Sequence, residues 1–338
     1  MKKVPVIPFL LSLTPVLITF FFSLTSWVSP VTPTIEENKI IAAAPILASD
    51  HITAPLPTLS IKTLPMDVPA DAVTPLEELH SQVLQDKLDE IVRSNSHWAS
   101  LAKNKTLNIG IVDMSDPLNA RYAAINSNNM VYAASLPKIA VLLASQESIE
   151  QGKITETAEV KADMRMMIAK SSNSAATRMI NRCGLKEIGQ IMQDPRYNLY
   201  DPANGGGLWV GKAYGGSSGR IGDPIKNLSH AASVMQVCKY YYKLAFGQLV
   251  SPEGSKAMLD VLVDPELHHK FVSVLDRVAP NAKVYRKSGT WENWHTDSAM
   301  VWDEDRKYIV VALAEDAGGE TMLRELMLKI DTALVAKG

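Results

Sequence analysis

A serine and a lysine stand three residues apart in the chain, at Ser135 and Lys138, where a helix is expected to begin. Residues at positions i and i+3 share one face of a helix, so the amine can accept the proton of the hydroxyl. This pairing would activate a serine as a nucleophile. The SxxK pattern also arises by chance, and taken alone it is more often a helix cap followed by a solvated lysine.

Two further patterns place polar groups at the edges of expected elements. Ser171 and Asn173 stand just before a helix expected from Ala175, where a polar cap is again the simpler interpretation. The segment Lys287-Ser288-Gly289-Thr290 follows a strand-like run. A cation, a hydroxyl and a glycine at a strand edge suit a substrate carboxylate, because glycine allows close backbone approach.

In this order the three patterns resemble the SxxK, SxN and K[ST]G motifs of penicillin-recognising serine enzymes, which include class A β-lactamases and penicillin-binding proteins. The resemblance covers roughly residues 74–338 and is closest to the class A branch. It implies that Ser135 is the acylated nucleophile, that Lys138 accepts its proton, and that Ser171 passes a proton to the leaving nitrogen. The implied activity is β-lactam hydrolysis through an acyl-enzyme, with no cofactor.

The same resemblance implies how the substrate binds. Asn173 would hold the substrate amide, and Lys287 and Ser288 would meet the carboxylate shared by penicillins and D-Ala-D-Ala peptides. The backbone N–H groups of Ser135 and Thr290 would form the oxyanion hole. Gly289, which precedes Thr290, would also line the substrate site. The expected partner is therefore a small β-lactam or a peptidoglycan peptide.

Two departures from the family concern the wall of the site and the release of the acyl group. The interval between Ser135 and Ser171 is shorter than is usual in class A enzymes, which predicts a more open site. Those enzymes also carry a glutamate that activates the deacylating water, whereas this chain has no Glu between Glu187 and Glu253. Asp201, followed by Pro202, stands in a sequence setting comparable to that of the family's glutamate. It is either a base with a shorter side chain or the cap of a turn. Both alternatives predict that the acyl group leaves Ser135 slowly, and a catalytic role predicts that Asp201→Asn slows this release further.

The elements that position these residues follow from the hydrophobic pattern. Helices are expected from Thr74 and over 320–336, and hairpins over 106–126 and 298–314. Residues 135–272 alternate helical periodicity with loops, and the run 229–244 is expected to be one helix. We therefore expect an α/β (α+β) fold, in which an antiparallel sheet is flanked by N- and C-terminal helices and carries an all-α insertion. The sheet part would comprise 74–134 and 273–338, and the helical part 135–272.

The composition of the 338 residues excludes several classes of protein. There are 34 Lys and Arg against 36 Asp and Glu, for a net charge of −2, so no basic excess indicates nucleic-acid binding. Two cysteines exclude a disulfide framework, and the seven histidines show no metal-binding spacing. No metal is expected. Cys183 and Cys238 are expected to be unpaired, with a disulfide between them as the alternative.

The N-terminal region has the composition of an export segment followed by a tether. Lys2 and Lys3 precede an uncharged run from Val4 to Thr34 that is rich in apolar residues. We expect residues 1–29 to be a cleaved signal peptide or a membrane anchor, and residues 30–73 to be a Pro-, Thr- and Ala-rich linker. The protein would act in the periplasm or outside the cell, released or attached to the outer face of the cytoplasmic membrane.

Several alternatives stay open. Gly215-Gly216-Ser217-Ser218-Gly219 fits the GxSxG nucleophile elbow, although a strand and a helix should flank such an elbow and neither is expected here. A D-Ala-D-Ala carboxypeptidase, an esterase and a β-lactam sensor that is acylated without turnover are further interpretations. Tyr214, Trp291 and Trp294 either line the cleft or pack in the core.

Overall fold

The structure, a computed structural model, describes residues 63–66, 68–215 and 219–335. The chain divides into two units, 1–54 and 55–338, and all described residues lie in the second. The expected signal or anchor over 1–29 and most of the expected linker therefore lie outside the described residues. Among the helices that the structure describes, none is long and apolar enough to cross a membrane.

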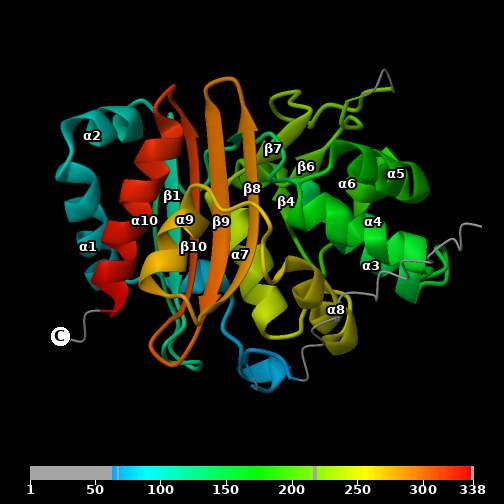
Figure 1. The fold of residues 1–338 in the computed structure, drawn as a ribbon, viewed down its shortest axis with the longest axis horizontal. Helices are drawn as coiled ribbons and strands as arrows, with labels where there is room; N and C mark the ends of the chain where they lie inside the picture. Colours follow the sequence, from blue (N-terminus) through cyan, green and yellow to red (C-terminus); the bar gives the residue numbers. More distant parts are fainter. Residues whose placement is uncertain (1–62, 67, 216–218, 336–338) are drawn as a thin grey trace, which may run out of the picture. The chain divides into compact units, whose positions relative to one another are not determined.

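A five-stranded antiparallel sheet forms the centre of the second unit, in the order β2-β1-β10-β9-β8 (Figure 1). Both expected hairpins are present, and the sheet confirms the expected fold class. Each of the long strands runs for several residues in regular register. Their bounds are β1 Leu107–Asp113, β2 Arg121–Ile125, β8 Lys283–Trp291, β9 Trp294–Trp302 and β10 Lys307–Glu315.

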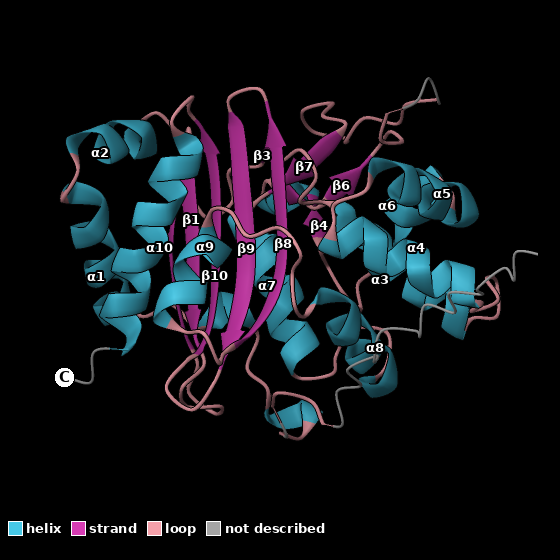
Figure 2. Ribbon diagram, viewed as in Figure 1, coloured by secondary structure: helices cyan, strands magenta, loops and turns pink. Residues whose placement is uncertain are grey.

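Helices cover both faces of this sheet and the space beyond its β8 edge (Figure 2). One face carries α1 Gln82–Arg93, α2 Ser96–Lys103, α9 Phe271–Val278 and α10 Gly319–Val335. The other face carries α7 Val234–Ala245, which packs against β1 and β10. The helices gathered beyond β8 are α3 Lys138–Glu150, α4 Ala158–Ala169, α5 Asn173–Cys183, α6 Leu185–Gln193 and α8 Pro252–Leu262.

The alternation of side chains along β1 explains how the sheet is held on both faces. Leu107, Ile109 and Ile111 join the core shared with α1 and α10. Gly110 faces the other way, and a methyl group there would lie 2.7 Å from Sγ of Cys238 on α7. A strand with period two therefore packs apolar side chains on one face and admits a close helix on the other.

The first helix begins later than the sequence predicts. Residues Leu76–Glu78 form only a 3₁₀ turn, and α1 starts at Gln82, where Ser81 caps it by accepting from the N–H of Leu84. The reason is pairing with β2: Tyr122 exchanges backbone hydrogen bonds with Leu79 and Ser81. Backbone groups of residues 79–81 that pair with Tyr122 cannot also form helical hydrogen bonds, so the expected helix from Thr74 is wrong at its start.

The expected helix over 229–244 is also shorter than predicted. His230–Ala232 form β7, which lies between β3 Val131–Tyr132 and β6 Trp209–Val210 in a small sheet, and the helix begins only at Val234. A second small sheet pairs β4 Tyr200–Asp201 with β5 Gly206–Gly207. The stretch 135–272 is thus mainly helical, and it also supplies these short strands and the sheet-covering helix α7.

Candidate active site

Ser135 lies in a tight turn between β3 and α3. The turn is closed by Ala134, whose φ of 49° is unusual for a residue with a side chain, and α3 begins at Lys138. The Lys138 side chain is fully buried, and its Nζ lies 3.1 Å from Oγ of Ser135. The structure therefore brings together the serine and lysine that the sequence pairs.

Lys138 Nζ is also bound to the loop between α4 and α5. It donates to the carbonyl O of Ser171 at 2.6 Å and to Oδ1 of Asn173 at 2.8 Å, and it lies 3.3 Å from Oγ of Ser171. Ser171 has a φ of 54°, a strained conformation for a serine, and this turns its carbonyl toward the lysine. Ser172 caps α5 by accepting from the N–H of Ala175, which fixes the loop on its other side.

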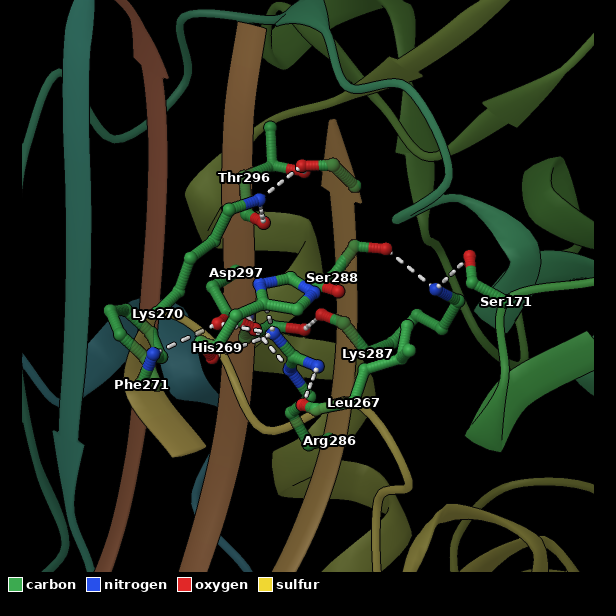
Figure 3. Close-up of polar contacts among 12 residues, drawn as sticks. Ser171, Leu267, His269, Lys270, Phe271, Arg286, Lys287, Ser288, Thr296 and Asp297 are labelled. Carbon is green, nitrogen blue, oxygen red and sulfur yellow. Dashed lines mark hydrogen bonds and ion pairs between the residues drawn. The ribbon is translucent and has the colours of Figure 1, made fainter. Parts of the chain in front are cut away.

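The third pattern reaches the same hydroxyl from the sheet. Lys287 on β8 is buried, and its Nζ donates to Oγ of Ser171 at 2.9 Å and to the carbonyl of Ser288 at 2.6 Å (Figure 3). The Ser171 hydroxyl consequently contacts two lysines, one from α3 and one from the edge strand of the sheet. Three segments that are far apart in the sequence meet at this oxygen.

The surroundings of the two lysines lower their affinity for protons. Burial lowers the pKa of Lys138 from 10.5 to about 7. Burial also holds the pKa of Lys287 well below its usual value, and the nearby charge of Lys138 adds to that effect. A lysine that is neutral at physiological pH can take a proton from a serine, which an ordinary surface lysine cannot.

Gly289 brings β8 against the serine. A methyl group on Gly289 would lie 2.5 Å from the carbonyl O of Ala133 and 2.6 Å from the backbone N of Ser135, so no larger residue fits without displacement. β8 is the edge strand of the sheet, and the bridge that the structure describes on its outer side joins Tyr285 to Val263. Gly289 thus brings the strand end that carries Thr290 beside Ser135, and an oxyanion hole formed by the N–H groups of Ser135 and Thr290 stays a prediction.

A family model described as the beta-lactamase enzyme family matches residues 158–337, more than half of the chain. The chain belongs to the beta-lactamase enzyme family. No curated sequence matches it at a significant level.

Solved structures are similar to the chain in fold, at identities below one fifth. A beta-lactamase from Sphaerobacter thermophilus has a TM-score of 0.57 and 16% identity, with 74% of this chain and 97% of that chain covered. A beta-lactamase from Chitinophaga pinensis has a TM-score of 0.56 and 14% identity, with 75% of this chain and 100% of that chain covered. PBP-A has a TM-score of 0.55 and 16% identity, with 75% of this chain and 96% of that chain covered.

Within this beta-lactamase fold, the Asp201 side chain bonds to residues of its own turn. Its side chain caps the short 3₁₀ turn Pro202–Asn204, accepting from the N–H of Ala203 at 2.9 Å and from Nδ2 of Asn204 at 2.6 Å. The hydrogen bonds that Ser135, Lys138 and Ser171 make with described residues include no carboxylate partner. Of the two interpretations of Asp201, this geometry favours the turn cap.

The remaining residues singled out in the sequence are a serine in a glycine-rich loop, two cysteines and two tryptophans. Ser217 lies outside the described residues, and the neighbouring stretches 211–215 and 219–229 are loop. Cys183 and Cys238 are both free thiols. Trp291 is largely exposed at the end of β8, whereas Trp294 packs edge-on against Tyr132.

A buried set of charges behind β8 has no signature in the sequence. Arg286 and Asp297 form a fully buried ion pair across β8 and β9, and Asp297 also accepts from the N–H of Phe271 (Figure 3). Lys270 is buried and donates to the carbonyl of Gly289 at 2.6 Å and to Oγ1 of Thr290 at 2.7 Å. Isolated charged residues in loops and strands form no motif, so only the fold reveals the buried ion pair and the support that Lys270 gives to Gly289 and Thr290.

Among the described residues, no group of three or more His, Cys, Asp or Glu side chains is placed to hold a metal ion. The described cluster itself consists of two serines, two lysines and one asparagine: Ser135, Ser171, Lys138, Lys287 and Asn173.

Proposed function

We propose that this beta-lactamase-family protein is acylated at Ser135 by β-lactams. The observation that carries the proposal is the chain of contacts from Ser135 Oγ through Lys138 and Ser171 to Lys287. In the proposed step Oγ attacks the lactam carbonyl carbon while its proton passes to neutral Lys138. The C–N bond then breaks, and the nitrogen takes a proton through the Ser171 hydroxyl, so that atoms and charges balance.

The proposed substrate carries a carboxylate next to the scissile amide. Lys287 Nζ and the Ser288 hydroxyl would bind this carboxylate, and Asn173 would bind the substrate amide. Buried Lys270 supports the same strand end by donating to the carbonyl of Gly289 and to Oγ1 of Thr290. Burial lowers the pKa of Lys287, and a substrate carboxylate in contact with its Nζ would raise that pKa again, so that the lysine binds the anion in its charged form. A PBP-A mutant solved as an acyl-enzyme complex with penicillin G has a similar fold, at 18% identity and a TM-score of 0.54 over 75% of this chain and 97% of that chain, which supports the substrate class.

We also propose that the acyl group leaves Ser135 slowly. Hydrolysis of an acyl-serine needs a base in contact with a water molecule. No carboxylate is bonded to the described Ser135 cluster, and Asp201 is engaged in its own turn. Release without a positioned base supports the behaviour of a penicillin-binding protein or a β-lactam sensor more than that of a fast β-lactamase.

The remaining parts of the proposal concern location and organisation. The Lys2-Lys3 start and the apolar run after it support export, with residues 74–338 as the catalytic domain outside the cytoplasmic membrane. A fusion after Gly338 to a reporter that works only in the cytoplasm tests this. We expect the reporter to be inactive, and an active one would overturn export.

Intact-mass measurement during incubation with penicillin G tests the proposed activity. A lasting adduct of one penicillin per protein is the expected result. Rapid loss of the drug without an adduct would support hydrolysis and contradict slow release. Absence of both would overturn the proposed function. Release of D-Ala from a peptide ending in D-Ala-D-Ala, measured in parallel, would support the carboxypeptidase alternative.

A further inference from the structure

Four oxygen atoms and one aromatic ring surround Lys138 Nζ. Oxygen atoms of Ser135, Ser171 and Asn173 lie 2.6–3.3 Å from the nitrogen. The ring of Tyr214 covers another side, with its centroid 4.4 Å from Nζ. Both side chains are buried, and the lysine has no exposed surface at all. The described neighbours of Nζ are thus three polar residues and one aromatic ring.

Tyr214 is held in this position from both its backbone and its ring. Its hydroxyl donates to the carbonyl of Ala134 at 3.3 Å, and its own carbonyl accepts from Oγ1 of Thr177 at 2.6 Å. The ring also packs against the imidazole of His230, with 4.3 Å between centroids. The partners of these contacts lie in the turn before Ser135, in α5 and in β7. Tyr214 is therefore held by three separate elements.

The hydroxyl of Tyr214 is unsuited to act as a base. It is bonded to a carbonyl, and the contact with Lys138 is made by the ring. Burial raises the pKa of this phenol well above its usual value, so the phenolate is not formed at physiological pH. The feature of Tyr214 that acts on Lys138 is consequently the volume of its ring.

We propose that the Tyr214 ring keeps the deacylating water away from Lys138 and thereby makes the acyl-enzyme long-lived. The proposal rests on the proposed acylation of Ser135. In the acyl-enzyme Lys138 is the basic group nearest the ester, and a water activated by it must lie within hydrogen-bond distance of Nζ. An aromatic ring at van der Waals distance takes up that space and offers no hydrogen bond. Tyr214 is thus a positioning residue that acts by exclusion.

Removal of the ring would open a hydrolytic route that uses groups already present. The water oxygen would bond to the ester carbonyl carbon while its proton passes to neutral Lys138. The bond between that carbon and Ser135 Oγ would then break, and Oγ would recover the proton from Lys138. The products are the free serine and a penicilloic acid, so the step needs no other reactant.

The test compares the half-life of the penicillin G acyl-enzyme in three proteins by intact-mass measurement. Tyr214→Ala removes the ring, and we expect the half-life to fall at least tenfold. Tyr214→Phe keeps the ring and loses only the bond to Ala134, so we expect its half-life to stay within about threefold of the parent. Tyr214→Ser is a second small variant, to be used if the alanine variant fails to fold.

The pH dependence separates water activation from simple loosening of the site. In the small variant the release rate should rise with pH through the pKa of Lys138, because the lysine must be neutral to accept the proton. That pKa is lowered to about 7 by burial in the parent and should lie higher once the ring is removed. An unchanged half-life in a folded, acylated small variant would overturn the inference and leave the acylation of Ser135 intact. A half-life that falls equally in Tyr214→Phe would also overturn it. Absence of an adduct in the parent protein would overturn the inference and the proposed function together.

Discussion

Gly289 approaches Ser135 so closely that a methyl group on the glycine would lie 2.6 Å from the serine's backbone N. The contact joins the edge strand of the sheet to the turn that starts α3. Carbon and nitrogen atoms that are not bonded do not approach to that distance, so a side chain at 289 must push the two segments apart. The geometry around the proposed nucleophile therefore depends on the absence of a side chain on β8.

Gly289→Ala is expected to slow acylation by about a hundredfold, the effect of a small misplacement of reacting groups. Gly219→Ala is the matched control, because a methyl group there meets no other described residue within 4 Å. Stopped-flow acylation with a chromogenic β-lactam measures both. Normal acylation in a folded Gly289→Ala protein would show that this contact does not set the site geometry.

The acylation rate is expected to rise with pH through about 7 and then to level off. Burial lowers the pKa of Lys138 to about 7, so the neutral, proton-accepting amine is the minor form below that pH and the major form above it. Single-turnover acylation measured between pH 5.5 and 9 checks this. A rate that does not change across that range, in protein that stays folded, would argue against Lys138 as the base.

Lys287→Ala is expected to weaken substrates that carry the carboxylate by about 10- to 100-fold, because a hydrogen bond to a charged group is worth about 1.5–3 kcal/mol. Neutral esters should lose much less, and only through the lost contact between Lys287 and Ser171. Lys283→Ala is the control, since Lys283 lies on the same strand and is exposed. The measurement is kcat/KM of each variant on both substrate classes. Equal losses of kcat/KM on the two classes would give Lys287 a purely structural role.

The sequence predicts the parts of this molecule that rest on local patterns. The hairpins of β1–β2 and β9–β10 follow from alternation, and the three short motifs predict which residues meet at Ser171. The late start of α1 is not predictable in this way, because it depends on pairing of residues 79–81 with Tyr122, a tertiary contact that overrides the local capping pattern.

The contacts of Tyr214, Lys270 and Asp297 are likewise set by the fold. Each is a single residue in a loop or strand, with its partners far away in the sequence. The motifs thus predict the reacting groups, whereas the groups that support or shield them become visible only in three dimensions.

Asp201→Asn is expected to leave both acylation and release within about twofold of the parent. The asparagine oxygen can still accept from the N–H of Ala203 and so retain the cap of the 3₁₀ turn. Mass-resolved release kinetics provide the measurement. A release rate that falls a hundredfold or more would instead identify Asp201 as the deacylating base.

The most direct test of the account is to locate the penicillin adduct by digestion and mass spectrometry in the parent protein, Ser135→Ala and Ser217→Ala. The account predicts an adduct on the peptide containing Ser135 in the parent and in Ser217→Ala, and none in Ser135→Ala with its thermal stability preserved. An adduct that persists in Ser135→Ala, or that disappears in Ser217→Ala, would contradict Ser135 as the nucleophile.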